Sequence, residues 1–516
     1  MMRRCISLLL TVFLCTPVLV AQKTAKIVTD RNVYIAGENI LCSVATFEKG
    51  KPSSVPAIAY VELVSRSGLA ASTKVALIDG RGAGSMKVAP GTPTGVYDIF
   101  AFSSDSDYAT GSEIWIFNTE STARVKDGVV LSDTEIPGAE SRTVVPSGIT
   151  VESRKEAGIM NVVIRNNRNI KTDLAVSVFE EDGLRAGEVQ KRIPHIPAEA
   201  EPEGEIVRAK VFGNDAELVK TRPWLIAIIS APGSLADTYT GCIDTDGSII
   251  FQTNNIFGDR DLVCEILGAE EEHIDCHFAP VSPFYLPEGL DSGSLALSKS
   301  MKPALSARHR AMKQSGTIAD TLYKFLPKRD NLLLSKDDCE RYFLDDYTRF
   351  PTVEDIILEL IPNVVVRKER GGKRIKITVK DVVTKKRSES VLVALDGVPV
   401  TRHDRLLAYD AMALSEVQVY PYTYAVGKTV FCGVVNFVTT KHDMSALAFD
   451  DNVRIIDFTG CSYPVAMRRE TAGDVAGGRT LLWHPSIELG PGEEWFFSVP
   501  AVSDHISVFA TDMLSF

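Results

Sequence analysis

Hydrophobic and polar residues alternate with period two along much of the chain, and the apolar runs are short. Between residues 26 and 118 the alternation is clearest at 40–44 and 59–63, and Gly, Pro, Ser and Asp separate the runs. This pattern is typical of half-buried strands joined by turns. Regularly spaced strands of this kind favour a β-sandwich. We therefore predict a β-sandwich over residues 22–120.

The same pattern continues from residue 147 to residue 284. The strands we predict there are Met160–Ile164, Leu174–Phe179, Ile206–Phe212, Leu225–Ile229 and Ile249–Phe251. They indicate one or two further β-sandwiches over residues 145–286. Residues 196–204 are rich in Pro and Glu and predict a linker or an exposed loop.

Two segments depart from the strand pattern. Residues 287–347 are rich in Lys, Arg, Leu and Asp, and 295–314 form a basic stretch with helical character. We interpret residues 287–347 as a helical basic connector, and a basic docking face is an equal alternative.

Residues 351–362 predict a short amphipathic helix. Their apolar residues recur at helical spacing from Val353 to Leu360, and Thr352 with Asp355 forms a capping pair. Strands are expected at 364–367, 374–379 and 391–395, the last ending in a turn at Asp396–Gly397. We predict a small α+β domain over residues 348–445 and a C-terminal β-sandwich segment over 446–516. The fold class is thus mainly β.

The N-terminus predicts export. Arg3 and Arg4 precede an apolar run from Ile6 to Val20, and small residues follow. This order is that of a secretory signal peptide, which we assign to residues 1–21. No later stretch is apolar for long enough to cross a bilayer, which takes about 20 residues in a helix.

Net charge bears on the possible partners, and cysteine content bears on disulfide bonding. The net charge of −11 disfavours nucleic acid and anionic membrane surfaces. The cysteines beyond the signal peptide are odd in number and follow no spacing pattern, so they predict no disulfide scaffold. A bridge between Cys264 and Cys276 is compatible with export, and buried free thiols explain the cysteines equally well.

Residues 29–47, 57–68 and 80–104 resemble the sandwich domain on the bait side of the alpha-2-macroglobulin superfamily. The resemblance rests on Asp30, Tyr34, Gly37, Glu38, Gly95 and Tyr97. It implies structural roles for them in the corners and core of a sandwich. The chain has no Cys-Gly-Glu-Gln run, so covalent capture through a thioester is excluded.

Residues 391–400 and 410–441 resemble the plug domain of TonB-dependent outer-membrane receptors. The positions that carry this resemblance are Asp396, Gly397, Asp410, Glu416, Gly427, Gly433, Thr439 and Lys441. A receptor barrel needs about 22 strands of about 9–11 residues each. Residues 442–516 cannot supply them. Within this segment, 479–489 and 495–500 resemble a late macroglobulin-type domain instead.

Together these resemblances suggest envelope proteins that combine macroglobulin-type sandwiches with a plug-like domain and lack the receptor barrel. They imply that the exported chain is periplasmic or associated with the outer membrane of a Gram-negative bacterium. No membrane-spanning segment remains after processing, and the oligomeric state is open.

Candidate catalytic and metal-binding patterns are weak. The chain contains no G-x-S-x-G, H-E-x-x-H, P-loop or G-x-G-x-x-G motif. Residues 244–247 begin like a calcium loop but predict a hairpin turn, and 270–272 predict a charged surface loop. His273, Cys276 and His277 lack a second ligand pair for zinc. We expect no catalytic residues, no cofactor and no metal.

A protein-binding role is the function we predict. In this hypothesis the chain is an accessory subunit that docks on an outer-membrane or surface protein through its sandwich and plug-like modules. One alternative is a thioester-less, macroglobulin-like protein that binds proteases, with residues 196–205 as the candidate bait. The other is a carbohydrate-binding envelope protein, but Trp115, Trp224, Trp483 and Trp495 lie in strand-like runs, where core packing is expected.

Overall fold

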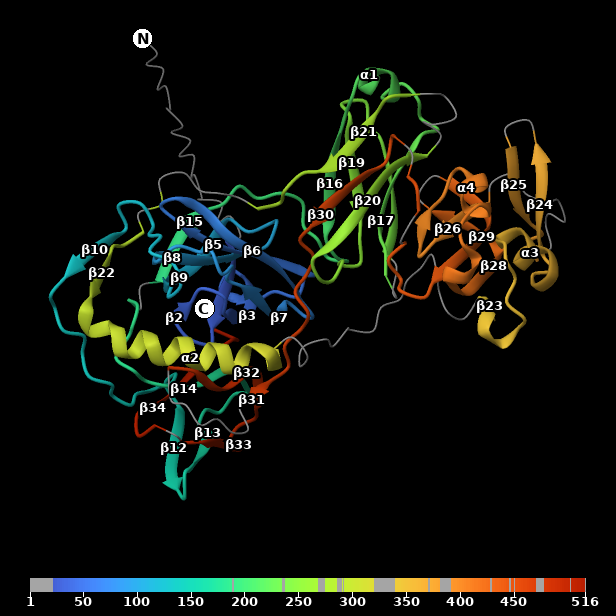
Figure 1. Cartoon of the computed structure of the whole chain (residues 1–516). Coiled ribbons are helices and arrows are strands. Elements are labelled where there is room, and N and C mark those ends of the chain that lie inside the picture. The colour runs from blue at the N-terminus through green and yellow to red at the C-terminus, as the bar shows by residue number, and fades with distance from the viewer. Residues whose placement is uncertain are drawn as a thin grey trace, which may run out of the picture.

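The computed structural model of the chain is mainly β, as predicted (Figure 1). It describes residues 22–187, 190–233, 237–267, 274–284, 290, 292–319, 339–369, 372–380, 391–426, 429–444, 447–449, 451–469, 478–501 and 503–515. The assigned signal peptide and Gly427 lie outside these residues. Within the described ranges, no helix combines the length and apolarity needed to cross a membrane.

The first sandwich is built from the N-terminal strands. Its sheet runs in the order β4-β3-β1-β9-β8-β5-β6, with β2, β7 and β15 paired at its sides. Alternating residues such as Ile40, Val44, Val61 and Leu63 point into one buried core. The strands are β1 (Lys23–Thr29), β2 (Val33–Ile35), β3 (Asn39–Glu48), β4 (Lys51–Pro52), β5 (Ile58–Ser65), β6 (Gly68–Ala76), β7 (Arg81–Lys87), β8 (Gly95–Phe102), β9 (Tyr108–Phe117) and β15 (Gln190–Pro194).

The second sandwich has two sheets, in the orders β19-β16-β21 and β18-β17-β20-β30. Strand β30 comes from the C-terminal part of the chain and pairs with β20. Its elements are β16 (Ile206–Phe212), α1 (Ala216–Val219), β17 (Ile226–Ala231), β18 (Asp237–Cys242), β19 (Ser248–Gln252), β20 (Arg260–Leu267), β21 (His277–Pro280) and β30 (Arg454–Phe458).

The third sandwich joins two distant parts of the chain. Its sheets run in the orders β11-β34-β14-β32-β31 and β12-β13-β33, around a core of Val162, Val176, Leu482 and Val508. The strands are β11 (Thr143–Val144), β12 (Ile149–Glu156), β13 (Ile159–Asn166), β14 (Thr172–Glu180), β31 (Arg468–Arg469), β32 (Thr480–Leu489), β33 (Glu494–Pro500) and β34 (Ile506–Asp512).

Strand pairing corrects the predicted division into 145–286 and 446–516. Residues 145–286 supply every strand of the second sandwich except the edge strand β30, whereas the third sandwich combines β12–β14 with β31–β34 from residues 446–516. The alternation of apolar residues predicts that a strand exists, but it does not identify the partner of that strand. The chain therefore nests one domain inside another.

The α+β unit, residues 339–449, is inserted between β21 and β30. Its sheet runs β23-β28-β29-β26-β27, with a separate β24–β25 hairpin. Thr352 caps α3 by accepting from the Asp355 N–H, as predicted. The elements are β23 (Glu340–Phe343), η3 (Leu344–Asp346), α3 (Val353–Leu360), β24 (Val364–Glu369), β25 (Gly372–Ile377), β26 (Leu392–Leu395), β27 (Val398–Pro399), α4 (His403–Leu407), η4 (Ala411–Ala413), β28 (Leu414–Val426) and β29 (Thr429–Thr439).

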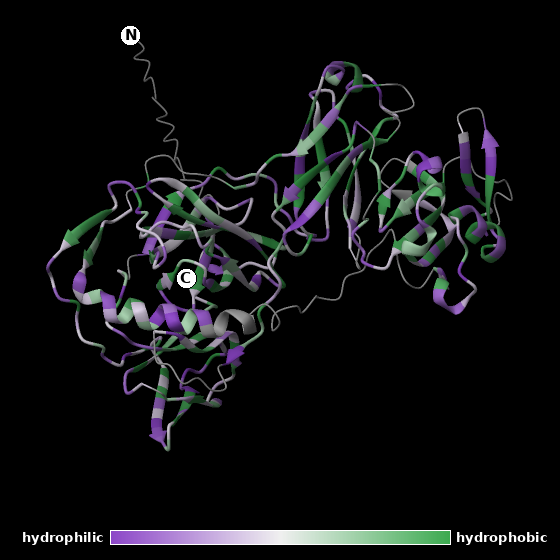
Figure 2. Ribbon diagram, in the orientation of Figure 1, coloured by the Kyte–Doolittle hydropathy of each residue, from purple (hydrophilic) through white to green (hydrophobic). Residues whose placement is uncertain are grey.

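The predicted basic connector contains a long helix, α2 (Lys302–Ala319), preceded by the short helix η1 (Lys299–Met301). Just before it, β22 (Leu295–Ser298) pairs in parallel with β10 (Val129–Ser132) as a separate two-stranded ribbon. Figure 1 shows α2 lying across the first sandwich beside this ribbon. Hydrophilic and hydrophobic positions alternate along α2, as Figure 2 shows, so one face can pack while another meets solvent.

Candidate functional site: a basic groove beside α2

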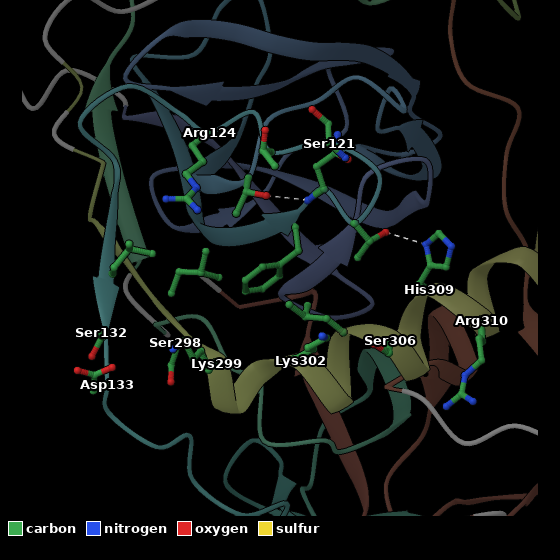
Figure 3. Close-up of a pocket in the computed structure, with 18 residues that line it drawn as sticks. Ser121, Arg124, Ser132, Asp133, Ser298, Lys299, Lys302, Ser306, His309 and Arg310 are labelled. Atoms are coloured by element: carbon green, nitrogen blue, oxygen red, sulfur yellow. Dashed lines mark hydrogen bonds between the residues drawn. The ribbon is translucent and has the colours of Figure 1, made fainter.

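An open groove of about 970 Å³ lies beside α2. Its walls are α2 with η1, the loop 118–124 that follows β9, and the β10–β22 ribbon. Figure 3 shows Lys299, Lys302 and His309 on the helical wall, with Ser121 and Arg124 across from them. The apolar side chains that line the groove are Phe117, Leu131, Leu297 and Leu305.

Local hydrogen bonds fix the loop wall. The Asn118 side-chain oxygen accepts from the backbone N–H groups of Glu120 and Ser121, at 3.0 and 2.8 Å. Its amide nitrogen donates to the carbonyls of Pro90 and Thr92. Asparagine favours such turns because its side chain can replace a backbone partner. The loop is therefore held against the first sandwich while its outer residues face the groove.

Buried contacts on its opposite face fix the helical wall. Arg308 is buried and donates two hydrogen bonds to the Asp182 carboxylate and one to the Val33 carbonyl. Met301 is buried in the same small core as Val33. A bidentate arginine–carboxylate pair fixes orientation as well as distance. Helix α2 is thus anchored to two sandwiches, and its groove-facing residues have a fixed position.

One end of the groove is closed by contacts between the loop and the helix. The Thr119 hydroxyl lies 2.7 Å from His309 Nδ1, and Lys313 pairs with Glu120 at 3.2 Å. Both pairs are at the surface and contribute little stability by themselves. They do hold the loop and α2 at a defined separation.

The groove carries an excess of positive charge. Arg124, Lys299, Lys302 and Arg310 line it, whereas Asp133 is the one acidic side chain among its lining residues. Among the described residues, these four cations make no side-chain hydrogen bond or ion pair. They stand in contrast to the net charge of −11 of the chain. An unneutralised basic surface on an acidic protein can attract anionic groups.

The macroglobulin-like residues lie away from the groove lining and serve the fold. The Asp30 carboxylate accepts from Tyr34, from the Leu41 N–H and from Thr480 of the third sandwich. Glu38 accepts from the Ile35 N–H and pairs with Arg31 at 3.0 Å. These residues therefore join the first sandwich to the third.

The glycines and Tyr97 of that group shape turns. Gly37 has a φ of +103°, a region that side chains rarely adopt. A Cβ on Gly95 would lie 2.4 Å from Val125, so the strand and the following loop could not pack as closely. Tyr97 donates to the Pro93 carbonyl at 2.7 Å.

Most of the plug-like residues stabilise the α+β unit. Asp396 is 1% exposed, has a φ of +50° and accepts from the Thr439 N–H, the Thr439 hydroxyl and the Met444 N–H. Gly397 continues this turn, and its carbonyl accepts from Thr238 of the second sandwich at 2.6 Å.

The remaining plug-like positions are dispersed. Asp410 caps η4 by accepting from the Met412 N–H, and Glu416 pairs with Arg341. A Cβ on Gly433 would lie 2.5 Å from Ile377, whereas Lys441 is exposed in the turn after β29. None of the positions that the structure describes lines the groove.

The prediction of an exposed loop at residues 196–204 agrees with most of this segment, since residues 197–204 form neither helix nor strand and 196–199, 202 and 203 are exposed. Parts of the loop nevertheless contact the first sandwich. Ala198 donates to the Ser104 carbonyl, and the Glu201 carbonyl accepts from the Ala57 N–H. Glu201 is only 1% exposed and accepts from Tyr60, and burial raises the pKa of its carboxyl. These contacts hold the exposed loop against the first sandwich, which composition alone could not predict.

The candidate metal-binding residues and the cysteines can now be placed in the structure. Residues 244–247 form the predicted turn, in which Gly247 donates to the Asp244 carbonyl. His273 and residues 270–272 lie outside the described residues. The cysteines Cys42, Cys242, Cys264, Cys276, Cys339, Cys432 and Cys461 are free thiols. Within the described part of the chain, no group of three potential ligands lies close enough for a metal ion.

One tryptophan differs from its predicted environment. Trp224 lies in a turn before β17, where it is 55% exposed, while the Arg222 guanidinium lies 5.1 Å from its ring centroid. Trp483 is fully buried, as predicted. A single exposed tryptophan does not build an aromatic platform for sugars.

The sequence indicated part of the groove. The basic stretch 295–314 includes Lys299, Lys302 and Arg310, and a docking face was one of its two interpretations. Arg124 and the loop 118–124 were missed because neither a motif nor a periodic pattern marks them. Their role depends on strand pairing that brings residues far apart in sequence together.

Comparisons with known proteins give weak similarities. No family model matches the chain, and no curated protein sequence matches it. It is similar to the native alpha-2-macroglobulin of E. coli at 9% identity, over 96% of this chain and 22% of that one, with a TM-score of 0.17. It is similar to Salmonella alpha-2-macroglobulin reacted with methylamine at 8% identity, over 96% and 39%, with a TM-score of 0.21.

A third similarity is to dimeric latent PorU from Porphyromonas gingivalis, at 9% identity over 54% of this chain and 34% of that one, with a TM-score of 0.16. The chain spans less than half the length of each of these proteins. TM-scores of this size do not place the chain in a fold family.

Proposed function

We propose that the chain is a non-catalytic protein of the cell envelope that binds a partner protein in the basic groove beside α2. The observation that carries the proposal is the group of four cations beside an apolar floor, none of which pairs with a described residue. Specific interfaces combine apolar burial with complementary charge. The walls of the groove are held by Asn118 and Arg308, so a partner would bind a preformed surface.

The position of the groove suits an accessory role. It lies on the first sandwich, whereas the α+β unit adjoins the second sandwich through the Thr238–Gly397 hydrogen bond (Figure 1). A partner in the groove would leave the α+β unit exposed for a second contact. In this proposal the partner is an outer-membrane or surface protein, and the export signal and the plug-like motif order support that location.

A pull-down tests the proposal. Tagged mature protein would be incubated with detergent-solubilised outer membranes of the native host, and retained proteins would be identified by mass spectrometry. We expect one envelope protein in stoichiometric amount, lost when Lys302 and Arg310 are both changed to Glu. Both residues are exposed and pair with no described residue, so the substitutions should leave the fold intact. Equal recovery by wild type and variant, or no partner at all, would contradict the proposal.

A further inference from the structure

We infer that the groove binds an extended, acidic segment of the partner, in which acidic residues alternate with apolar ones. The inference rests on the proposed function and names the chemistry that the partner must present. It follows from the spacing of the cations, the position of the apolar side chains and the polar groups left without partners.

The cations are distributed along the groove. Lys302 and Arg310 are eight positions apart on α2, which corresponds to about 12 Å along the helix axis. Lys299 precedes them and Arg124 lies on the opposite wall. A single phosphate or carboxylate cannot reach cations spread over this distance. Several anionic groups on one chain can reach them.

An extended peptide has matching dimensions. Four residues of a strand span about 13 Å, and alternate side chains lie about 7 Å apart on one side. Two acidic residues four positions apart would lie about 13 Å apart on one side, close to the spacing of about 12 Å between Lys302 and Arg310. The intervening side chains would point to the other side of the segment.

The floor of the groove accepts these intervening side chains. Leu131 is 69% exposed, and Leu297 and Leu305 are partly buried beside it. Covering such side chains contributes roughly 25 cal/mol for each Å² of apolar surface removed from water. The favoured segment is therefore amphipathic, with Val, Ile or Leu between its acidic residues.

Polar groups in the walls can satisfy the backbone of the segment. Among the described residues, the hydroxyls of Thr122 and Ser306 form no hydrogen bond, and both residues line the groove. Strands β10 and β22 pair only with each other among the described strands, so the ribbon has free edges. Extended peptides commonly bind to unpaired strand edges.

An anionic saccharide fits the groove less well. Sugar rings are commonly held by exposed aromatic faces, and the aromatic side chain in the lining is Phe117, which is only 1% exposed. The exposed apolar floor would remain uncovered beneath a polar sugar. The positive charge is compatible with an anionic polysaccharide, but the apolar floor is better covered by a peptide.

The probe is a short fluorescein-labelled peptide of alternating Glu and Val, added to the full-length mature protein and followed by fluorescence anisotropy. We expect saturable binding that weakens as salt is raised. The Lys302→Glu, Arg310→Glu variant should bind at least about tenfold more weakly, because two attractive charges become repulsive. Arg124→Glu, on the other wall, should weaken binding in the same direction.

Three controls make the result decisive. The Lys51→Glu, Lys210→Glu variant carries the same change of net charge on exposed residues that do not line the groove, and it should bind like wild type. A peptide with Lys in place of Glu should not bind. A peptide of alternating Glu and Ser should bind more weakly, since it cannot cover the floor.

Two outcomes would overturn the inference. One is tighter binding of a sulfated oligosaccharide than of the Glu-Val peptide, which would assign the groove to anionic sugars. The other is peptide binding that the groove variants leave unchanged. If the pull-down still yields a partner that depends on Lys302 and Arg310, the proposed function stands and only the acidic segment is wrong.

Discussion

Single residues that resemble functional motifs act mainly within the fold. Asp396 and Asp30 each accept several hydrogen bonds from buried groups, and each is only 1% exposed. Buried carboxylates need such partners because burial without them is costly. The sequence could therefore identify these positions as important, but it could not show that their partners are internal.

The Asp396 turn leads to a first prediction. Asp396→Ala removes all three accepted hydrogen bonds and should lower the free energy of unfolding of the α+β unit by about 2–4 kcal/mol. Asp396→Asn should lower this free energy by less, because Asn tolerates a positive φ and keeps a hydrogen-bond acceptor. Hydrogen exchange at the Thr439 and Met444 amides would measure the loss. Equal protection in Asp396→Ala and wild type would contradict this role.

His403 predicts a pH dependence. Burial, aided by the charge of Arg374, lowers its pKa from the usual 6.5 to about 4. The folded state therefore favours the neutral ring, whose Nδ1 accepts from the Ile375 N–H. The stability that this ring contributes is present above pH 6.5 and decreases as the pH falls from 6.5 towards 4. The loss amounts to about 3 kcal/mol.

The variant His403→Asn tests that dependence. Asn can accept the same hydrogen bond and does not titrate, so its stability should fall less than that of wild type between pH 7 and pH 4.5. Urea unfolding, with hydrogen exchange to follow the α+β unit, measures both. Parallel pH profiles would show that the ring is not the group responsible.

Single elements were predicted well where their signal is local. Helix α3 follows from its capping pair and its apolar spacing, and β16 has the bounds that alternation predicts. Local composition predicted the exposed loop at residues 196–204 but not its buried contact. There the charged Glu201 is buried and accepts a hydrogen bond from Tyr60, so the exposed loop is held against the first sandwich.

This bound segment predicts resistance to proteolysis. Broad-specificity proteases should not cleave folded protein within residues 196–204, because the backbone is hydrogen-bonded to the first sandwich. Glu201→Ala should make the segment at least several-fold more sensitive. The cleavage sites can be mapped by mass spectrometry after brief digestion. Rapid cleavage there in wild type would instead support a bait function.

The arrangement of the sandwiches could not be predicted from the sequence in the same way, because it depends on long-range strand pairing. In the third sandwich, β14 pairs with β32 and β34, which follow the entire inserted region in the sequence. The alternation of apolar residues does not predict which strands pair. The groove depends on the same long-range assembly. Its helical wall was predicted as a basic stretch, whereas its loop wall became recognisable only beside α2.

A buried ion pair between the first two sandwiches gives a further prediction. Lys74 and Glu205 lie 2.5 Å apart and are 1% and 2% exposed, and Lys74 Nζ also lies 4.0 Å from the centroid of the Phe458 ring. Lys74→Met leaves a buried carboxylate without its partner and should lower the free energy of unfolding by about 3–5 kcal/mol. Adding Glu205→Leu should recover most of this loss. Chemical unfolding of the single and double variants measures it, and equal losses in both would contradict a coupled pair.

The central claim is that a partner protein occupies the basic groove, and photocrosslinking in the native host tests it most directly. A photoreactive amino acid would replace Ser306, which lines the groove, and in a separate variant Lys51, which does not. We predict one crosslinked partner from the Ser306 position and none from the Lys51 position. No adduct at Ser306, or the same adducts at both positions, would contradict the claim.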